Sequence, residues 1–212
     1  MIEINNILDV EKYINNLDVI IFDLDDTLYS EKEYVKSGFK AIAKEYPQIK
    51  NMEEKLWAAF ENGKSAIDYV LERENFLVEK ENCLTIYREH RPNISLYLGV
   101  RELLERLSKH KHLAMITDGR PSGQRLKIQA LKIDDLFEKI IITDELGGLN
   151  FRKPNGKSYS LIRKYFNTEY DKCVYVGDNL SKDFIYPNKT GMKSIFFNNR
   201  DGLHCIKKEE QE

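Results

Sequence analysis

Two aspartates, Asp23 and Asp25, directly follow the apolar run Val19–Phe22 and are separated by one residue. Side chains two residues apart in an extended segment point to the same side, so both carboxyl groups are expected to face one site. One can attack an electrophilic atom while the other transfers a proton. Phosphoryl transfer needs such a pair, because an anion attacks phosphorus in line and the leaving oxygen requires a proton. The spacing therefore predicts Asp23 as a nucleophile and Asp25 as a general acid and base.

Further polar residues follow later apolar runs of the sequence. Thr117 and Asp118 end a second run, Lys153 stands in the loop after a third, and Asp178 follows a fourth. Carboxylates that converge from several strand ends repel one another strongly unless a cation lies among them. A hard divalent cation with oxygen ligands suits such a place. We therefore expect Mg²⁺ at this site, with Asp23 and Asp178 among its ligands.

Thr117 and Lys153 carry groups that suit the oxygens of a phosphoryl group. Thr117 offers a hydroxyl and a strand-end amide, and Lys153 offers a mobile ammonium. Both can balance the charge that develops in the transition state, and Lys153 can also pair with Asp23 and keep it ionised. Asp118 either contacts the substrate as well or closes a turn with Gly119. Thr27, Asn179 and Asp183 are expected to support the site. Asp183 either ligates the metal or orients its waters.

These residues are placed by short, β-branched apolar runs that alternate with amphipathic stretches. The strand-like runs are 19–22, 113–116, 140–142, 173–176 and 194–197. The segments between them that carry apolar residues at helical spacing are 100–109, 122–131 and 156–166. The alternation predicts an α/β fold, a Rossmann-like parallel sheet with helices on both faces. In such a sheet, ligands bind at the carboxyl ends of the strands, where the polar residues stand.

Residues 30–92 break this alternation. The segment has no strand-like run and is rich in Glu, Lys, Ala and Leu, a composition typical of helices. We interpret it as an all-helical domain inserted into an α/β core, which residues 1–29 and 93–212 would form. A helical portion of one single core is the alternative.

Composition restricts the partners and the compartment. Lysine and arginine number 33 against 35 acidic residues, a net charge of -2, so there is no basic excess to attract nucleic acid. The cysteines Cys83, Cys173 and Cys205 are too scattered for a disulfide framework or a zinc site. The N-terminal residues lack the apolar stretch of a secretory signal, and no apolar run approaches a membrane span. We expect a cytoplasmic protein that binds neither nucleic acid nor membrane.

The ordered motifs resemble those of the haloacid dehalogenase superfamily. The segment 23–28, with the sequence DLDDTL, is similar to the first motif of that family, and Thr117 at the end of LAMIT is similar to the second. Lys153 before Pro154 matches the third motif, and the segment 177–183, GDNLSKD, matches the fourth. A match to the first motif alone is weak, because aspartate and threonine are common in turns after strands. The ordered set is far more specific.

The resemblance implies a ligand set, a cap and an activity. In the family, Mg²⁺ is usually held by the first aspartate, the backbone carbonyl of the second and the aspartate of the fourth motif, which map to Asp23, Asp25 and Asp178. Residues 30–92 occupy the place of the family's helical cap, which closes over small substrates and excludes water. The implied activity is hydrolysis of a small phosphorylated metabolite, of the nucleotide or sugar phosphate class, through an aspartyl phosphate.

Several other functions share parts of this pattern. A phosphomutase uses the same four motifs and stays open. A dehalogenase and a phosphonate-cleaving enzyme are disfavoured, because relatives of those types depart from aspartate at the position of Asp25. A phosphoacceptor signalling domain is disfavoured because Asp23 stands on the first expected strand and an insertion follows it. A catalytically silent relative is disfavoured because every motif residue is present. The oligomeric state and the particular substrate are not indicated by the sequence.

Overall fold

The computed structural model describes residues 1–204 and forms two compact units. The first unit consists of Met1–Glu31 together with Ser95–Glu212, and the second consists of Lys32–Ile94. A β-sheet and its flanking helices make up the first unit, whereas the second is helical.

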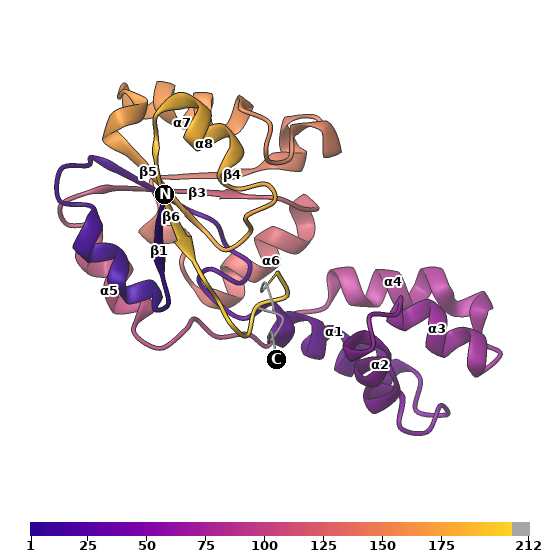
Figure 1. Ribbon diagram of the computed structural model, residues 1–212. Helices are drawn as coiled ribbons and strands as arrows, with labels where there is room; N and C mark the ends of the chain where they lie inside the picture. Colours follow the sequence, from indigo (N-terminus) through magenta and orange to yellow (C-terminus); the bar gives the residue numbers. More distant parts are fainter. Residues whose placement is uncertain (205–212) are drawn as a thin grey trace, which may run out of the picture. The chain divides into compact units, whose positions relative to one another are not determined.

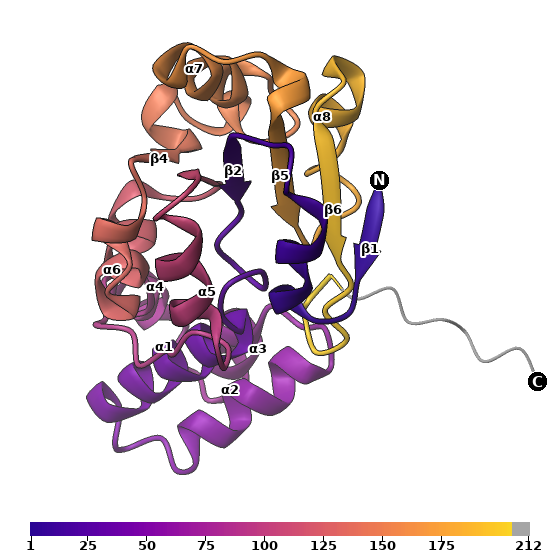
Figure 2. The same ribbon diagram turned by 90° about the vertical axis from the view of Figure 1, so that its left-hand side faces the viewer.

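A six-stranded parallel sheet lies at the centre of the first unit. The strands are β1 (Ile2–Ile4), β2 (Val19–Phe22), β3 (His112–Thr117), β4 (Lys139–Ile142), β5 (Cys173–Gly177) and β6 (Lys193–Phe197). Their order is β1-β6-β5-β2-β3-β4. Figure 2 labels β1, β6, β5, β2 and β4 in this sequence from one edge of the sheet to the other. The predicted parallel α/β fold is therefore confirmed. Strand β1 was not predicted, because it has three residues, one of them Glu3, and pairs with β6 from the opposite end of the chain.

Helices cover both faces of this sheet. Figure 1 shows α7 and α8 on one face and α5 and α6 on the other. These helices are α5 (Val100–Leu107), α6 (Pro121–Leu131), α7 (Lys157–Phe166) and α8 (Ile185–Thr190). The central strands β2 and β5 are buried along their whole length, which explains why their sequences are continuously apolar rather than alternating.

The second unit contains the four helices that follow the first motif. They are α1 (Glu31–Glu45), α2 (Met52–Glu61), α3 (Ala66–Arg73) and α4 (Lys80–Glu89). Its core is apolar, with Phe39, Ile42, Leu56 and Leu71 among the buried side chains. Each helix buries one stripe against the others, as expected for amphipathic helices that are stabilised mainly by packing.

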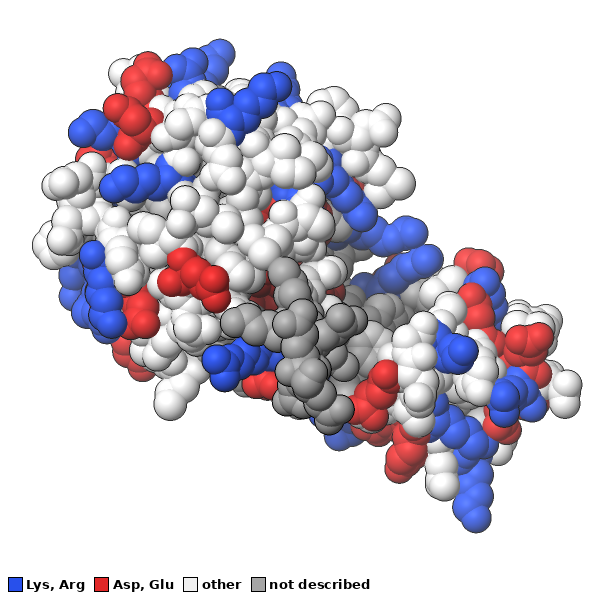
Figure 3. All heavy atoms as spheres, viewed as in Figure 1, with Lys and Arg blue, Asp and Glu red and all other residues white. Residues whose placement is uncertain are grey.

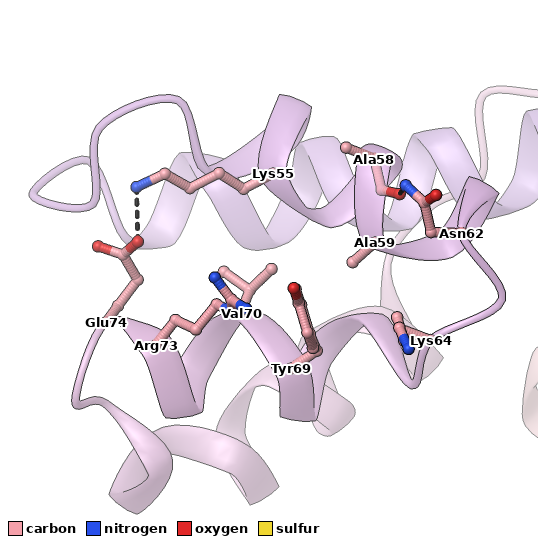
Figure 4. A pocket seen from close by; sticks show the side chains of 9 residues that line it. All are labelled: Lys55, Ala58, Ala59, Asn62, Lys64, Tyr69, Val70, Arg73 and Glu74. Atoms are coloured by element: carbon pink, nitrogen blue, oxygen red, sulfur yellow. Dashed lines mark hydrogen bonds and ion pairs between the residues drawn. The ribbon is translucent and has the colours of Figure 1, made fainter.

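A hollow of about 740 Å³ lies between α2 and α3 of the helical unit. Figure 4 shows the side chains of the two helices that line it, with Lys55 close to Glu74 on its rim. The Nζ of Lys55 lies 2.6 Å from a carboxylate oxygen of Glu74, and the guanidinium of Arg73 lies 4.4 Å from the ring centroid of Tyr69. Alanine and valine side chains form the apolar part of the lining.

The surface agrees with the near-neutral composition. On the face seen in Figure 3, basic and acidic side chains both occur, with uncharged surface between them. None of the helices among residues 1–204 is both long enough and apolar enough to span a membrane. Cys83 and Cys173 are buried free thiols, and Cys205 lies outside the described residues.

Candidate active site

The predicted site residues of the first unit gather at the carboxyl ends of β2, β3 and β5. Strand β2 lies between the other two, and Phe22 pairs with Met115 on β3 and with Val176 on β5. The backbone N–H of Asp23 continues this ladder with a 2.9 Å hydrogen bond to the carbonyl of Val176. The topology therefore places the residues that follow these three strands next to one another, which agrees with the general position of ligand sites in parallel sheets.

Lys153 is the cation at the centre of this site. Its side chain is fully buried, and its Nζ lies 2.7 Å from Oδ1 of Asp23 and 2.9 Å from Oδ1 of Asp183. The same ammonium donates a 2.8 Å hydrogen bond to the hydroxyl of Tyr175. Three oxygen atoms thus surround a group with three N–H bonds. An ammonium without such partners would be too costly to bury.

Three buried carboxylates stand around this cation. One oxygen from each of Asp23, Asp178 and Asp183 lies within 4.8 Å of the others, which is close enough for a shared metal ion. Burial, together with the neighbouring charges of Asp23 and Asp183, raises the pKa of Asp178 to about 9. Burial also raises the pKa of Asp23, to about 6, although Lys153 opposes this change. One ammonium does not offset three buried carboxylates, so the cluster favours an added cation.

Asp25 has very different surroundings. Its Oδ1 accepts a 2.7 Å hydrogen bond from Nζ of Lys127 and a further hydrogen bond from the hydroxyl of Tyr29. Its Oδ2 accepts a 2.9 Å hydrogen bond from Nε2 of Gln124. Burial acts to raise the pKa of Asp25, but Lys127 and the other donors outweigh it, and the pKa lies below its ordinary value. The two carboxylates are thus distinguished by what contacts them.

Gln124 and Lys127 were not found by the sequence reasoning. Both lie on α6, and the residues that this helix buries are Gln124, Lys127, Ile128 and Leu131. The signal was present: these positions form one helical stripe, and two of its four members are polar. A buried lysine and glutamine on the core side of a helix require partners, which here include Asp25.

The predicted phosphate-binding residue Thr117 is fully buried at the end of β3. Its Oγ1 accepts a hydrogen bond from Nε2 of Gln124, so the threonine keeps its own hydroxyl hydrogen for another acceptor. Thr27 is also fully buried, and among the described residues its Oγ1 has no hydrogen-bond partner. The structure thus brings Thr117 to the site and leaves the supporting role of Thr27 a prediction.

Asp118 contacts the loop that carries Lys153. Its Oδ1 accepts hydrogen bonds from Thr143 (2.8 Å) and from the backbone N–H of Lys153 (3.1 Å). Its Oδ2 lies 3.2 Å from Nζ of Lys182, a second lysine that the sequence reasoning did not select. Burial opposes ionisation of Asp118, but Lys153 and Lys182 outweigh it, and the pKa is lowered. Both oxygens are engaged, which favours a role in fixing the Lys153 loop; contact with substrate stays a prediction.

The turn after β5 is held by the residues of the fourth motif. The backbone N–H of Asn179 donates a 3.0 Å hydrogen bond to Oδ2 of Asp183, and Oδ1 of Asn179 accepts from the hydroxyl of Ser181. A Cβ at position 177 would collide with Asp183, which explains why glycine stands there. Asp183 therefore contacts Lys153 and the turn at once, and Asn179 supports the turn rather than facing a ligand.

Two other aspartates near the strand ends form hydrogen bonds and an ion pair that stabilise loops. Asp26, which has a positive φ of 52°, accepts hydrogen bonds from the backbone N–H groups of Glu31 and Leu203. Asp144 forms a bidentate pair with Arg152, at 2.7 and 2.8 Å, immediately before Lys153. These aspartates organise the segments that carry site residues without joining the acidic cluster.

A family model and several known proteins match this chain. The model described as haloacid dehalogenase-like hydrolase matches residues 20–197. The glyceraldehyde 3-phosphate phosphatase of Pyrococcus furiosus is 37% identical over 100 residues, which cover 47% of this chain and 40% of that protein. The match therefore spans well under two thirds of that relative's length. The glyceraldehyde 3-phosphate phosphatase of Methanocaldococcus jannaschii is 26% identical over 191 residues, which cover 83% of this chain and 82% of that protein.

Solved structures share the fold. The haloacid dehalogenase-type hydrolase YfnB from Bacillus subtilis, bound to magnesium, superimposes with a TM-score of 0.65. Its sequence is 17% identical, and the superposition covers 87% of this chain and 88% of that one. At this identity the likeness concerns the fold alone.

Proposed function

The chain belongs to the haloacid dehalogenase-like hydrolases, and on this premise we propose that it is a magnesium-dependent phosphoric monoester hydrolase. The observation that carries the proposal is the difference between two carboxylates two residues apart. Asp23 lies among other acids and next to Lys153, whereas hydrogen-bond donors surround Asp25. A nucleophile beside a cation site and a separately held proton carrier are the two groups that phosphoryl transfer from a monoester requires.

The acidic cluster fits Mg²⁺ by its chemistry. It offers oxygen donors alone, and the three carboxylates are buried with Lys153 as a counter-charge. The side chains of Asp23 and Asp178 and the backbone carbonyl of Asp25 would hold the ion, with Asp183 close by. When bound, the ion would offset the negative charge of nucleophile and phosphate.

The reaction then proceeds in two steps on this chain's own residues. A carboxylate oxygen of Asp23 attacks phosphorus while the bond to the leaving oxygen breaks, and Asp25 gives its proton to that oxygen. A water molecule next gives a proton to Asp25 and attacks phosphorus, which releases phosphate and restores Asp23. The hydroxyl of Thr117 binds a non-transferring oxygen, and the ammonium of Lys153, next to Asp23, offsets the charge of the phosphoryl group.

The substrate we propose is a small phosphorylated metabolite of the sugar phosphate class. Relatives of this chain are named glyceraldehyde 3-phosphate phosphatase, which supports this class over a phosphoprotein. We further propose that the helical unit, Lys32–Ile94, is the cap that selects among such substrates. Its apolar core and its lined hollow give it the form of a separate folding element that can carry recognition residues.

Phosphate release tests the proposal. The purified protein should release phosphate from 4-nitrophenyl phosphate and from glyceraldehyde 3-phosphate with Mg²⁺, and should lose this activity with a chelator. Release without any bisphosphate activator separates the hydrolase from a phosphomutase. Asp23→Asn should reduce turnover at least about 10³-fold with an unchanged circular dichroism spectrum.

A matched control is Asp18→Asn, at the other end of β2, where the side chain is exposed. Its turnover should equal that of the wild type. Full activity of Asp23→Asn, or activity that persists without a divalent cation, would contradict the mechanism.

A further inference from the structure

Half of the residues that α6 buries are polar. Lys127 is buried, although a lysine on the core side of a helix is costly to desolvate. Its Nζ lies 2.7 Å from Oδ1 of Asp25, across 102 residues of sequence. Gln124, one helical turn earlier, contacts the other oxygen of the same carboxylate. The helix therefore presents two donors to one acid.

The hydrogen-bond donors around Asp25 are distributed unequally between its two carboxylate oxygens. Each carboxylate oxygen can accept about two hydrogen bonds. Oδ1 accepts from both Lys127 and the hydroxyl of Tyr29. Oδ2 accepts a 2.9 Å hydrogen bond from Nε2 of Gln124. One oxygen is thus held by two donors, and the other retains an acceptor position.

Gln124 also joins Asp25 to the phosphate-binding end of β3. Its Nε2 donates to both Oδ2 of Asp25 and Oγ1 of Thr117. When Asp25 is ionised it accepts hydrogen bonds, so in that state the amide nitrogen of Gln124 is the group that faces it. One amide therefore fixes the distance between the proton carrier and the hydroxyl that faces the phosphoryl oxygens.

We propose that Lys127 is a positioning residue of the reaction, which together with Tyr29 holds Asp25 by Oδ1 and so directs Oδ2 to carry the transferred proton. The inference rests on the proposed function, because it concerns the orientation of the acid and base of that reaction. In the first step the proton moves from Oδ2 to the leaving oxygen as the P–O bond breaks and the bond from Asp23 to phosphorus forms. In the second step a water proton moves to Oδ2 as the water oxygen bonds to phosphorus and the bond from Asp23 breaks.

A pair of aryl phosphates whose leaving groups differ in acidity tests this role. Phenol is a much poorer leaving group than 4-nitrophenol, so phenyl phosphate depends more strongly on a well-placed acid. In Lys127→Met, kcat/KM should fall further for phenyl phosphate than for 4-nitrophenyl phosphate. We expect the ratio of the two kcat/KM values to change about ten-fold. The ratio cancels the fraction of folded enzyme, so a merely structural defect leaves it unchanged.

The matched control is Lys132→Met at the end of the same helix, where the side chain is exposed. Its ratio should equal that of the wild type. If Lys127→Met does not fold, Tyr29→Phe provides the second test, since it removes one donor to Oδ1 and keeps the buried ring. Its ratio should change in the same direction by about three-fold.

The outcomes separate the inference from the proposed function. A wild-type protein that hydrolyses both esters, with variants whose kcat/KM values fall by equal factors or do not fall, overturns the positioning role and leaves the hydrolase in place. A ratio that shifts toward phenyl phosphate also overturns it. A wild-type protein that releases no phosphate from either ester overturns the proposed function, and the positioning role with it.

Discussion

The two units of this protein differ in what they bury. The α/β unit buries many polar and charged side chains, Asp23, Lys127, Lys153, Asp178 and Asp183 among them. None of the buried polar or charged side chains of the described structure lies in residues 32–94, where the core is apolar. Because buried charge is costly and seldom adds stability over an apolar core, its presence in the α/β unit supports the proposal that the chemistry takes place there.

Recognition residues of the helical unit must lie on its surface rather than in its interior. Its interior is an ordinary hydrophobic core, so any contribution to substrate choice comes from exposed or half-exposed residues, such as those around the hollow between α2 and α3. The α/β unit shows the opposite arrangement, with its distinctive side chains inside.

Replacement of Lys153 by methionine should have the largest effect of the changes considered. Asp23 and Asp183 would lose a buried cation that lies within 2.9 Å of both. We expect a loss of about 3–5 kcal/mol in the free energy of unfolding and at least about 10³-fold in kcat, measured by urea titration and phosphate release. Wild-type turnover in this variant would contradict the proposal that the buried charged residues take part in catalysis.

Leu56→Ala tests the helical unit in the same way. Leu56 is fully buried in its apolar core, so the truncation should lower the free energy of unfolding by about 3 kcal/mol. Turnover of 4-nitrophenyl phosphate should stay within about three-fold of the wild type, measured well below the unfolding temperature. A loss of turnover as large as that of Lys153→Met would show that this core takes part in the chemistry.

The pH dependence of stability sharpens the comparison further. Burial raises the pKa of Asp178 to about 9 without metal, so the folded chain holds that proton more tightly than the unfolded chain. Its stability is then greatest below the ordinary carboxyl pKa and is lost as the pH rises toward 9. We expect a decrease of at least about 1 kcal/mol between pH 6 and pH 9 in chelator.

Mg²⁺ should reverse this decrease, since it binds the ionised carboxylates. Asp178→Asn should show a smaller decrease in chelator and a weaker rise of the unfolding temperature with Mg²⁺. Equal unfolding temperatures with and without the ion at pH 9 would contradict the assignment of the acidic cluster as its site.

Asp118→Asn separates loop positioning from substrate contact. The amide keeps the shape and can keep the oxygen that accepts from the backbone N–H of Lys153, but it loses the charge opposite Lys182. We expect kcat to fall about ten-fold with KM little changed, measured with 4-nitrophenyl phosphate. A rise in KM at constant kcat would instead favour the predicted contact with substrate.

Lys55→Met should have the smallest effect. The pair of Lys55 and Glu74 lies on the rim of the hollow, with side chains 39% and 29% exposed. Partly exposed pairs contribute little, so the free energy of unfolding should change by less than about 1 kcal/mol, measured by urea titration. A larger loss would mean that the helical unit depends on charge as the α/β unit does.

Much of the site was predictable because the sequence carries it locally. A short apolar run followed by aspartates predicts a strand end, and parallel strands bring such ends to one edge, which is how Asp23, Lys153, Asp178 and Asp183 come together. The parallel sheet and the helices α5, α6 and α7 follow from the same periodic signals.

The partners of Asp25 were not predictable in this way. Lys127 lies 102 residues away and Gln124 lies 99 residues away, and neither belongs to a local motif. Their side chains reach the acid only because α6 packs its polar stripe inward after β3. Strand β1 was missed for a related reason, since its pairing with β6 joins opposite ends of the chain.

The sequence by itself determined which residues stand at the strand ends, because strand and loop signals are short-range and the chemistry of carboxylate and ammonium is intrinsic to the residue. Only the tertiary structure decided how each carboxylate is surrounded. Packing between distant segments placed Asp23 among acids and placed donors around Asp25, and the properties of an ionisable group depend on its burial and neighbours rather than on its position in the chain.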